Sequence, residues 1–252
     1  MRYMLLIHQG DTPTPRSPEA WAKLSEDEQK AVFADYQAIN QTPGVTPGVG
    51  LDAPETATTV RVKDGKTLTT DGPYLLGLGT VEPRKDLPTL VRAFASLAAE
   101  LPHRLVLAGL AGWGAGALAA EVAASGVAER ILLAGYVPEA DKAALFTGAD
   151  VFAYPSRYEG FGLPVLEAMA CGTPAVTTTG GSLPEVAGDA AALVEPGDAG
   201  ALAAAVAKLA ADPAARRDAA GRGLARAATF TWERCADLTA AAYCRALGRD
   251  TG

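Results

Sequence analysis

The sequence is poor in the residues that hold metal ions and disulfides. It has only two histidines, His8 and His103, in 252 residues. Its three cysteines, Cys171, Cys235 and Cys244, are odd in number and lack metal-ligand spacing, which predicts reduced thiols rather than a disulfide framework. No set of His, Asp and Cys side chains has ligand spacing, so we expect no metal and no other cofactor. His103 lies in a turn, where we expect an exposed and inert side chain.

The chain also lacks runs of basic residues and long apolar stretches. Its formal net charge is -7, which argues against nucleic acids and anionic membrane surfaces as partners. The apolar run within the first seven residues is too short for a signal peptide or a membrane span, and no longer run follows. We therefore expect a cytoplasmic protein.

Hydrophobic residues make up 49% of the chain, which is enough for a sizeable core. From residue 74 onward, short apolar runs alternate with helical patterns, which is typical of α/β proteins with a doubly wound, Rossmann-like parallel sheet. Asp86 precedes one helical pattern as a candidate N-cap. The expected strands lie at residues 74–78, 105–108, 131–134, 151–154, 174–177 and 191–194.

The first 72 residues follow a different pattern. An apolar run at residues 2–8 predicts a strand, and a helix follows whose start is marked by Ser17-Pro18-Glu19 or by a capping box from Ser25 to Glu28. Residues 58–62 and 66–70 alternate around Asp64-Gly65, which is a strong hairpin signal. The order β-α-β-β predicts a small α+β module at residues 1–72, separate from the domain at residues 73–252.

The segment from Ser156 to Val176 carries the most informative pattern. It places Glu159 and Glu167 on either side of the turn Gly160-Phe161-Gly162-Leu163, with Pro164 as a first-turn helix proline and Glu167 expected on the first turn. The turn follows the strand at residues 151–154, and ligands of open α/β sheets bind at that end of the strands. Glycine lets backbone N–H groups approach a ligand, and a helix N-terminus favours a phosphate. A solvated loop glutamate and a favourable helix acid would give the same pattern.

Residues 73–247 resemble the C-terminal, donor-binding half of retaining glycosyltransferases with the GT-B fold. The resemblance includes Pro73 to Lys85, Leu105 to Gly109, Gly135 to Pro138 and Phe230 to Cys235. Glu159 and Glu167 match the two glutamates, with seven residues between them, that mark this family. The resemblance implies a metal-independent enzyme that moves a hexose from a nucleoside-diphosphate sugar to an acceptor hydroxyl, with retention of configuration.

The resemblance also implies roles for individual residues. Arg84 and Lys85 would bind the donor diphosphate, whose negative charge grows during transfer, and Glu159 would act beside them as the third catalytic residue. The same two cations could instead be a solvated pair at a helix start. The implied donor-binding positions are Gly79, Thr80, Tyr136, Val137, Gly160, Phe161, Gly162, Leu163 and Glu167. The backbone of Tyr136 and Val137 would hold the nucleobase, and Glu167 the ribose.

Residues 1–74 resemble the front of the small YCII-related proteins, which have a ferredoxin-like fold. Asp71-Gly72-Pro73-Tyr74 stands where that family has its Asp-Gly-Pro-Phe sequence, but the helix and strand that follow in the family have no counterpart here. The chain therefore looks like a natural fusion or an engineered chimera. Unpaired edges of such a partial module invite pairing, which predicts a homodimer through the N-terminal module or a close domain contact.

These resemblances leave two functions open. The chain could be a glycosyltransferase, but the family places its acceptor site in an N-terminal domain that residues 1–72 do not resemble. It could instead be a catalytically incomplete protein that binds a nucleotide sugar or mediates assembly.

Overall fold

The computed structural model describes residues 23–25, 27–30, 58–63, 66–71 and 73–247. The chain divides into two compact units, residues 1–57 and residues 58–252. In the first unit, Ser25 and Glu28 form the expected capping box, with Ser25 N donating to Glu28 Oε2 over 2.8 Å and residues 27–30 helical. The expected strand at residues 2–8 and His8 lie outside the described residues, as does most of the YCII-like segment.

The second unit begins with the predicted hairpin. Strands β1 (Thr58–Lys63) and β2 (Lys66–Asp71) pair antiparallel, from Thr58 opposite Asp71 to Lys63 opposite Lys66. This register confirms the predicted pairing of the two strands.

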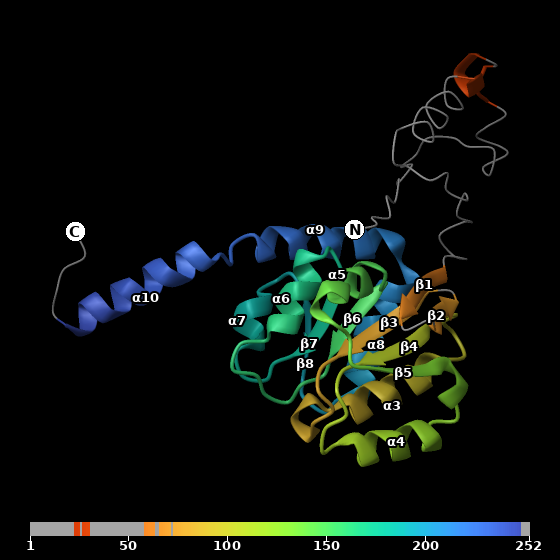
Figure 1. Ribbon diagram of the computed structural model, residues 1–252, viewed down its shortest axis with the longest axis horizontal. Helices are drawn as coiled ribbons and strands as arrows, with labels where there is room; N and C mark the ends of the chain where they lie inside the picture. Colours follow the sequence, from red (N-terminus) through yellow and green to blue (C-terminus); the bar gives the residue numbers. More distant parts are fainter. Residues whose placement is uncertain (1–22, 26, 31–57, 64–65, 72, 248–252) are drawn as a thin grey trace. The chain divides into compact units, whose positions relative to one another are not determined.

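A six-stranded parallel sheet forms the centre of the second unit (Figure 1). Its order is β5-β4-β3-β6-β7-β8, so the chain builds outward from β3 to one edge and then returns beside β3 as β6. All six strands coincide with predicted ones, and the Rossmann-like α/β prediction is confirmed. The strands are β3 (Tyr74–Leu78), β4 (Arg104–Ala108), β5 (Ile131–Gly135), β6 (Val151–Tyr154), β7 (Ala175–Thr178) and β8 (Ala192–Val194).

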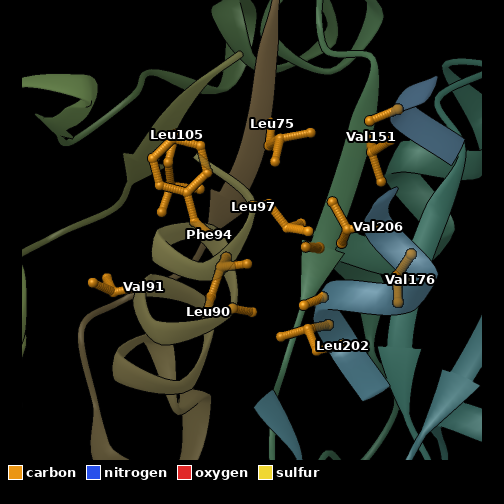
Figure 2. Packing of buried hydrophobic residues seen from close by; sticks show 14 of the residues in the cluster. Leu75, Leu90, Val91, Phe94, Leu97, Leu105, Val151, Val176, Leu202 and Val206 are labelled. Atoms are coloured by element: carbon orange, nitrogen blue, oxygen red, sulfur yellow. The ribbon is translucent and has the colours of Figure 1, made fainter. Parts of the chain in front are cut away.

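Helices cover both faces of this sheet. Side chains alternate between the faces along a strand, so Leu75 packs on one face and Leu76 on the other. Figure 2 shows the first face, where α3 (Leu87–Leu97) and α8 (Ala199–Ala211) pack Phe94 and Val206 among the strand side chains. The second face packs against α5 (Glu139–Thr147), α6 (Leu163–Ala170) and α7 (Leu183–Ala187).

The remaining helices contribute at most one buried residue each to the hydrophobic core. They are α4 (Ala115–Ala124), α9 (Pro213–Ala227) and α10 (Trp232–Ala246), with the short 3-10 turns η2 (Pro83–Lys85) and η3 (Ala128–Arg130). Helix α9 packs against α6. Helix α10 has no buried residue, and Trp232 is 84% exposed. Among the described residues no helix is long and apolar enough to cross a membrane.

One expectation about a single residue is wrong, and another holds for the position but not for the side chain. His103 is buried, and its Nε2 lies 2.9 Å from Asp150 Oδ2, because the turn before β4 folds against the end of the core instead of facing solvent. Asp86 does occupy the N-cap position of α3, but its backbone is left-handed (φ 48°) and its side chain makes no capping hydrogen bond. The carboxylate instead lies 2.9 Å from the Arg157 guanidinium.

Phe94 should contribute strongly to stability, because its side chain is only 1% exposed between α3 and the sheet. We expect Phe94→Ala to lower the free energy of unfolding by about 3–5 kcal/mol, since it leaves a cavity in a close-packed core. Urea denaturation followed by circular dichroism measures the change. The control Tyr243→Ala removes an aromatic ring that is 68% exposed on α10, and should change stability by less than about 0.5 kcal/mol. Equal effects of the two changes would contradict this assignment of the core.

Candidate functional site at the switch point of the sheet

The candidate site lies where the loops after β3 and β6 meet. These two strands are neighbours, but the chain leaves them toward opposite edges of the sheet, which is where open α/β sheets bind ligands. Two hydrogen bonds join the loops at one carbonyl: Arg157 N donates to Arg84 O over 2.7 Å, and Ser156 Oγ lies 3.0 Å from the same oxygen. The turn η2 is thereby held beside the β6 loop.

The Glu159 carboxylate is the centre of this site. Lys85 Nζ lies 2.6 Å from its Oε1, and Arg84 Nη1 lies 2.9 Å from each carboxylate oxygen. Glu159 and Lys85 are both buried, whereas the Arg84 side chain is 48% exposed. The structure therefore brings together the three residues predicted to be catalytic, and excludes the solvated alternative for Glu159 and Lys85.

Two hydroxyl groups that the sequence reasoning missed complete the surroundings of this carboxylate. Tyr154 Oη lies 2.9 Å from Glu159 Oε1, and Ser156 Oγ lies 2.7 Å from the same oxygen. Lys85 Nζ also donates a hydrogen bond to Tyr154 Oη. The signal available in the sequence was positional: Tyr154 is the last residue of a strand, and Ser156 lies three residues before Glu159.

These contacts set the protonation states of the site. Burial alone would raise the pKa of Glu159, but hydrogen bonds from Lys85, Ser156 and Tyr154 outweigh it and lower that pKa below its ordinary value. Burial, followed by the charge of Glu159, raises the pKa of the Tyr154 hydroxyl far above its ordinary value. The site consequently holds an ionised carboxylate next to a neutral phenol at neutral pH.

The backbone of Glu159 is held by contacts between its own loop, after β6, and the loop after β7. Glu159 forms a parallel bridge with Gly181, and Ser182 N donates to Glu159 O over 3.1 Å. A Cβ at Gly181 would lie 2.3 Å from Glu159 O, and one at Gly180 would lie 2.3 Å from Arg157 O. These two glycines thus permit the close approach of the β7 loop to the Glu159 loop.

The predicted glycine turn leads into α6 as expected. Gly162 has φ 99° and stands directly before the helix, with Pro164 in the first turn. A Cβ at Gly160 would meet nothing within 4 Å, so this part of the turn faces open space. Leu163 is exposed, and the partly exposed ring of Phe161 contacts Phe230 edge-on at a centroid distance of 6.0 Å.

Glu167 stands apart from the Glu159 cluster. The expected first-turn position is wrong, because α6 begins at Leu163 and Glu167 is its fifth residue, on the second turn. Lys142 Nζ on α5 lies 3.5 Å from Glu167 Oε1 and 2.8 Å from Glu139 Oε2. The two glutamates therefore have different basic partners.

The remaining predicted residues follow β3 and β5. Gly79 has φ 151°, and its carbonyl lies 1.9 Å from where a Cβ on Gly109 would be, so the loops after β3 and β4 touch through their backbones. Thr80 follows in the same loop, half-buried. Tyr136 and Val137 follow the edge strand β5, which β4 separates from β3, and the Tyr136 side chain is exposed. In the described part of the chain, no group of three His, Cys, Asp or Glu side chains could hold a metal ion.

Comparison with known proteins identifies relatives of this domain. The family model of glycosyl transferases group 1 matches residues 61–225. O-antigen chain mannosyltransferase B from Escherichia coli is 43% identical over 172 residues, which are 68% of this chain and 45% of that protein. The chain thus spans less than half the length of this curated relative.

Solved structures share the fold of the domain. Sucrose-phosphate synthase from Thermosynechococcus elongatus matches with a TM-score of 0.62 and 32% identity, covering 70% of this chain and 46% of that one. The Anabaena protein HepE, solved in complex with UDP and glucose, matches with a TM-score of 0.56 and 24% identity, covering 62% and 43%. At 24% identity this second likeness shows the fold alone.

Gly181 should be intolerant of a side chain. It has φ 64°, and a Cβ there would collide with Glu159 O. We expect Gly181→Ala to lower the free energy of unfolding by more than about 1 kcal/mol, because the backbone is left-handed and the neighbouring loop must move. The control Gly116→Ala lies in α4 with nothing within 4 Å, and should leave stability equal or slightly higher. Equal urea midpoints for both variants would contradict the proposed loop contact.

Glu159 should make stability depend on pH in the acid range. Its pKa is lower in the folded chain than its ordinary value of 4.5, so its contribution is complete above that pH and is lost as the pH falls through the folded pKa. Glu159→Gln should therefore destabilise the protein most above pH 4.5, with the difference from wild type shrinking at lower pH. Urea denaturation at a series of pH values measures this. The control Glu100→Gln, at an exposed position, should change stability by less than about 0.5 kcal/mol at pH 7. A curve for Glu159→Gln that runs parallel to wild type would contradict the assignment.

Proposed function

Because the chain belongs to the glycosyl transferases group 1 family, we propose that it binds a nucleoside-diphosphate sugar at the β3–β6 switch point and takes part in hexosyl transfer with retention. The observation that carries this proposal is the cluster of Arg84 and Lys85 around Glu159 at the carboxyl end of the sheet. Two cations beside an open glycine turn and a helix N-terminus suit a diphosphate. HepE, which shares the fold, was solved with UDP and glucose.

Donor binding would change the partners of the two cations. In the structure their negative partner is Glu159, and the half-exposed Arg84 can turn toward a ligand without leaving a buried site. The diphosphate would take over both cations, and the Glu159 carboxylate would then accept hydrogen bonds from the sugar hydroxyls. Negative charge grows on the diphosphate as the sugar leaves, so Arg84 and Lys85 would act mainly in the transition state.

The other predicted residues would hold the rest of the donor. Glu167 would accept hydrogen bonds from the ribose hydroxyls, and the backbone of Tyr136 and Val137 would contact the base. Gly79 and Thr80 would approach the phosphates from the β3 loop. The turn from Gly160 to Leu163 would face the sugar and the phosphates, and the open space beside Gly160 supports this placement.

The division of the chain stays a prediction. Residues 73–252 would be the donor-binding domain, and residues 1–72 a partial YCII-like module through which two copies pair. The compact units divide between Ala57 and Thr58, so the β1–β2 hairpin groups with the second unit. A cytoplasmic location and a chimeric origin are parts of the same proposal.

A second candidate function is nucleotide-sugar binding without transfer. It rests on the position of the family match at residues 61–225, whereas the family places its acceptor site in an N-terminal domain that residues 1–72 do not resemble. Transfer needs an acceptor held in near-attack geometry, which a donor site alone does not provide. Incubating the purified chain with nucleotide sugars and acceptors distinguishes the two: turnover that Glu159→Ala abolishes indicates transfer, whereas tight binding without turnover indicates binding alone.

The donor site should bind nucleoside diphosphates through Arg84 and Glu167. We expect calorimetric titration with UDP, GDP and their sugars to show binding by the wild type, and about 10–100-fold weaker binding by Arg84→Ala and by Glu167→Ala. We choose Arg84→Ala and not a Lys85 variant, because without Arg84 the buried Glu159 carboxylate still has the buried Lys85 ammonium group as its partner. Glu185→Ala, an exposed first-turn change in α7, is the matched control and should bind like wild type. A wild type that binds none of these ligands would refute the proposal.

A further inference from the structure

The Tyr154 hydroxyl has a fixed direction between the two charged groups of the site. Lys85 Nζ can only donate, so its hydrogen bond to Tyr154 Oη uses a lone pair of the phenol. The phenol hydrogen is then left for Glu159 Oε1, 2.9 Å away. Lys85 also reaches Glu159 directly, so the three side chains form a closed triangle.

Tyr154 also differs from the other donors in how firmly it is held. Its ring is 1% exposed and packs against Phe152 at a centroid distance of 5.7 Å, at the end of the buried strand β6. Arg84 is half exposed, and Ser156 Oγ has three acceptors within reach, namely Arg84 O, Tyr158 O and Glu159 Oε1, for its single hydrogen. Tyr154 is therefore an uncharged hydrogen-bond donor to Glu159, and packing in the core fixes the orientation of its side chain.

We propose that Tyr154 is a positioning residue, whose hydroxyl holds the Glu159 carboxylate aimed at the sugar while Lys85 and Arg84 transfer to the donor diphosphate. This inference rests on the proposed donor site and deepens it. Donor binding would draw Lys85 and Arg84 away from Glu159 toward the diphosphate. The buried carboxylate then still needs a hydrogen-bond donor that does not move to the phosphates. A neutral hydroxyl on a buried strand meets that need, because it carries no charge and cannot swing toward the ligand.

The charged and titratable groups around the triangle come from η2 and its N-cap, from β6 and from α6. Lys85 and Arg84 belong to η2, with Glu82 2.9 Å from Arg84 Nε on its outer side. Tyr154 lies on β6, and Glu167 on α6 acts on the phenol through its charge. Because Tyr154 and Ser156 add hydrogen bonds to the ionised form of Glu159, removal of either hydroxyl raises the pKa of that carboxyl.

The first test uses the ligand-free protein and the variant Tyr154→Phe, which deletes only the hydroxyl. NMR titration of the protein labelled with ¹³C at glutamate carboxyl groups follows Glu159, whose signal is assigned by its loss in Glu159→Gln. We expect the Glu159 midpoint to move to higher pH in Tyr154→Phe. The control Tyr158→Phe removes the hydroxyl of a tyrosine in the same loop that is 65% exposed, and should leave the midpoint unchanged. Identical midpoints in both variants would overturn the proposed link.

The second test separates the sugar from the diphosphate. Calorimetry with UDP and UDP-glucose, and with GDP and GDP-mannose, should show that Tyr154→Phe weakens binding of the nucleotide sugar that the wild type prefers by about tenfold. Binding of the bare diphosphate should weaken less, because Lys85 and Arg84 remain and no sugar hydroxyl contacts Glu159. An equal loss for both ligands would overturn the positioning role. If the wild type binds no nucleotide, the proposed function fails, and the titration still decides whether Tyr154 acts on Glu159.

Discussion

The arrangement of the site depends on how the negative charge of one buried carboxylate, that of Glu159, is compensated. A charged group out of water is costly unless hydrogen bonds and opposite charge compensate it, and Glu159 has both. Lys85 and Arg84 supply charge, and Tyr154 and Ser156 supply hydroxyl groups. These partners come from the loop after β3, the last residue of β6 and the loop after β6, so compensation of Glu159 also fixes how the two loops meet.

The sheet supplies the rigidity that this compensation requires. Buried side chains on both faces of β3 and β6 hold the two strands side by side, and the glycines after β4 and β7 let neighbouring loops touch backbone to backbone. The charged side chains are thus carried on a framework set by apolar packing. Arg84 is the partly exposed member, and it is the cation that can reorient toward a ligand with least disturbance of the core.

Under the proposed function, a donor diphosphate would meet cations that already have a negative partner. In the structure the Glu159 carboxylate is that partner for both Lys85 and Arg84. A diphosphate entering the site would compete with Glu159 for Lys85 and Arg84, so affinity for the donor would be reduced by the cost of that exchange. Part of the free energy of donor binding would be used to separate Glu159 from the two cations. The carboxylate would then be available to accept hydrogen bonds from the sugar.

The sequence by itself indicated where the six strands of an α/β domain and the hairpin at residues 58–71 lie along the chain, because apolar periodicity and turn residues are local signals. The choice of Arg84, Lys85 and Glu159 as site residues came from the family resemblance. It could not show that these three side chains touch, since 75 positions separate Arg84 from Glu159 in the chain. Three features depend on contacts between distant segments: the burial of His103, the close approach of Gly180 and Gly181 to the Glu159 loop, and the hydrogen bonds of the Tyr154 hydroxyl. Only tertiary structure decided them, because a side chain's solvent exposure and hydrogen-bond partners are set by what packs against it.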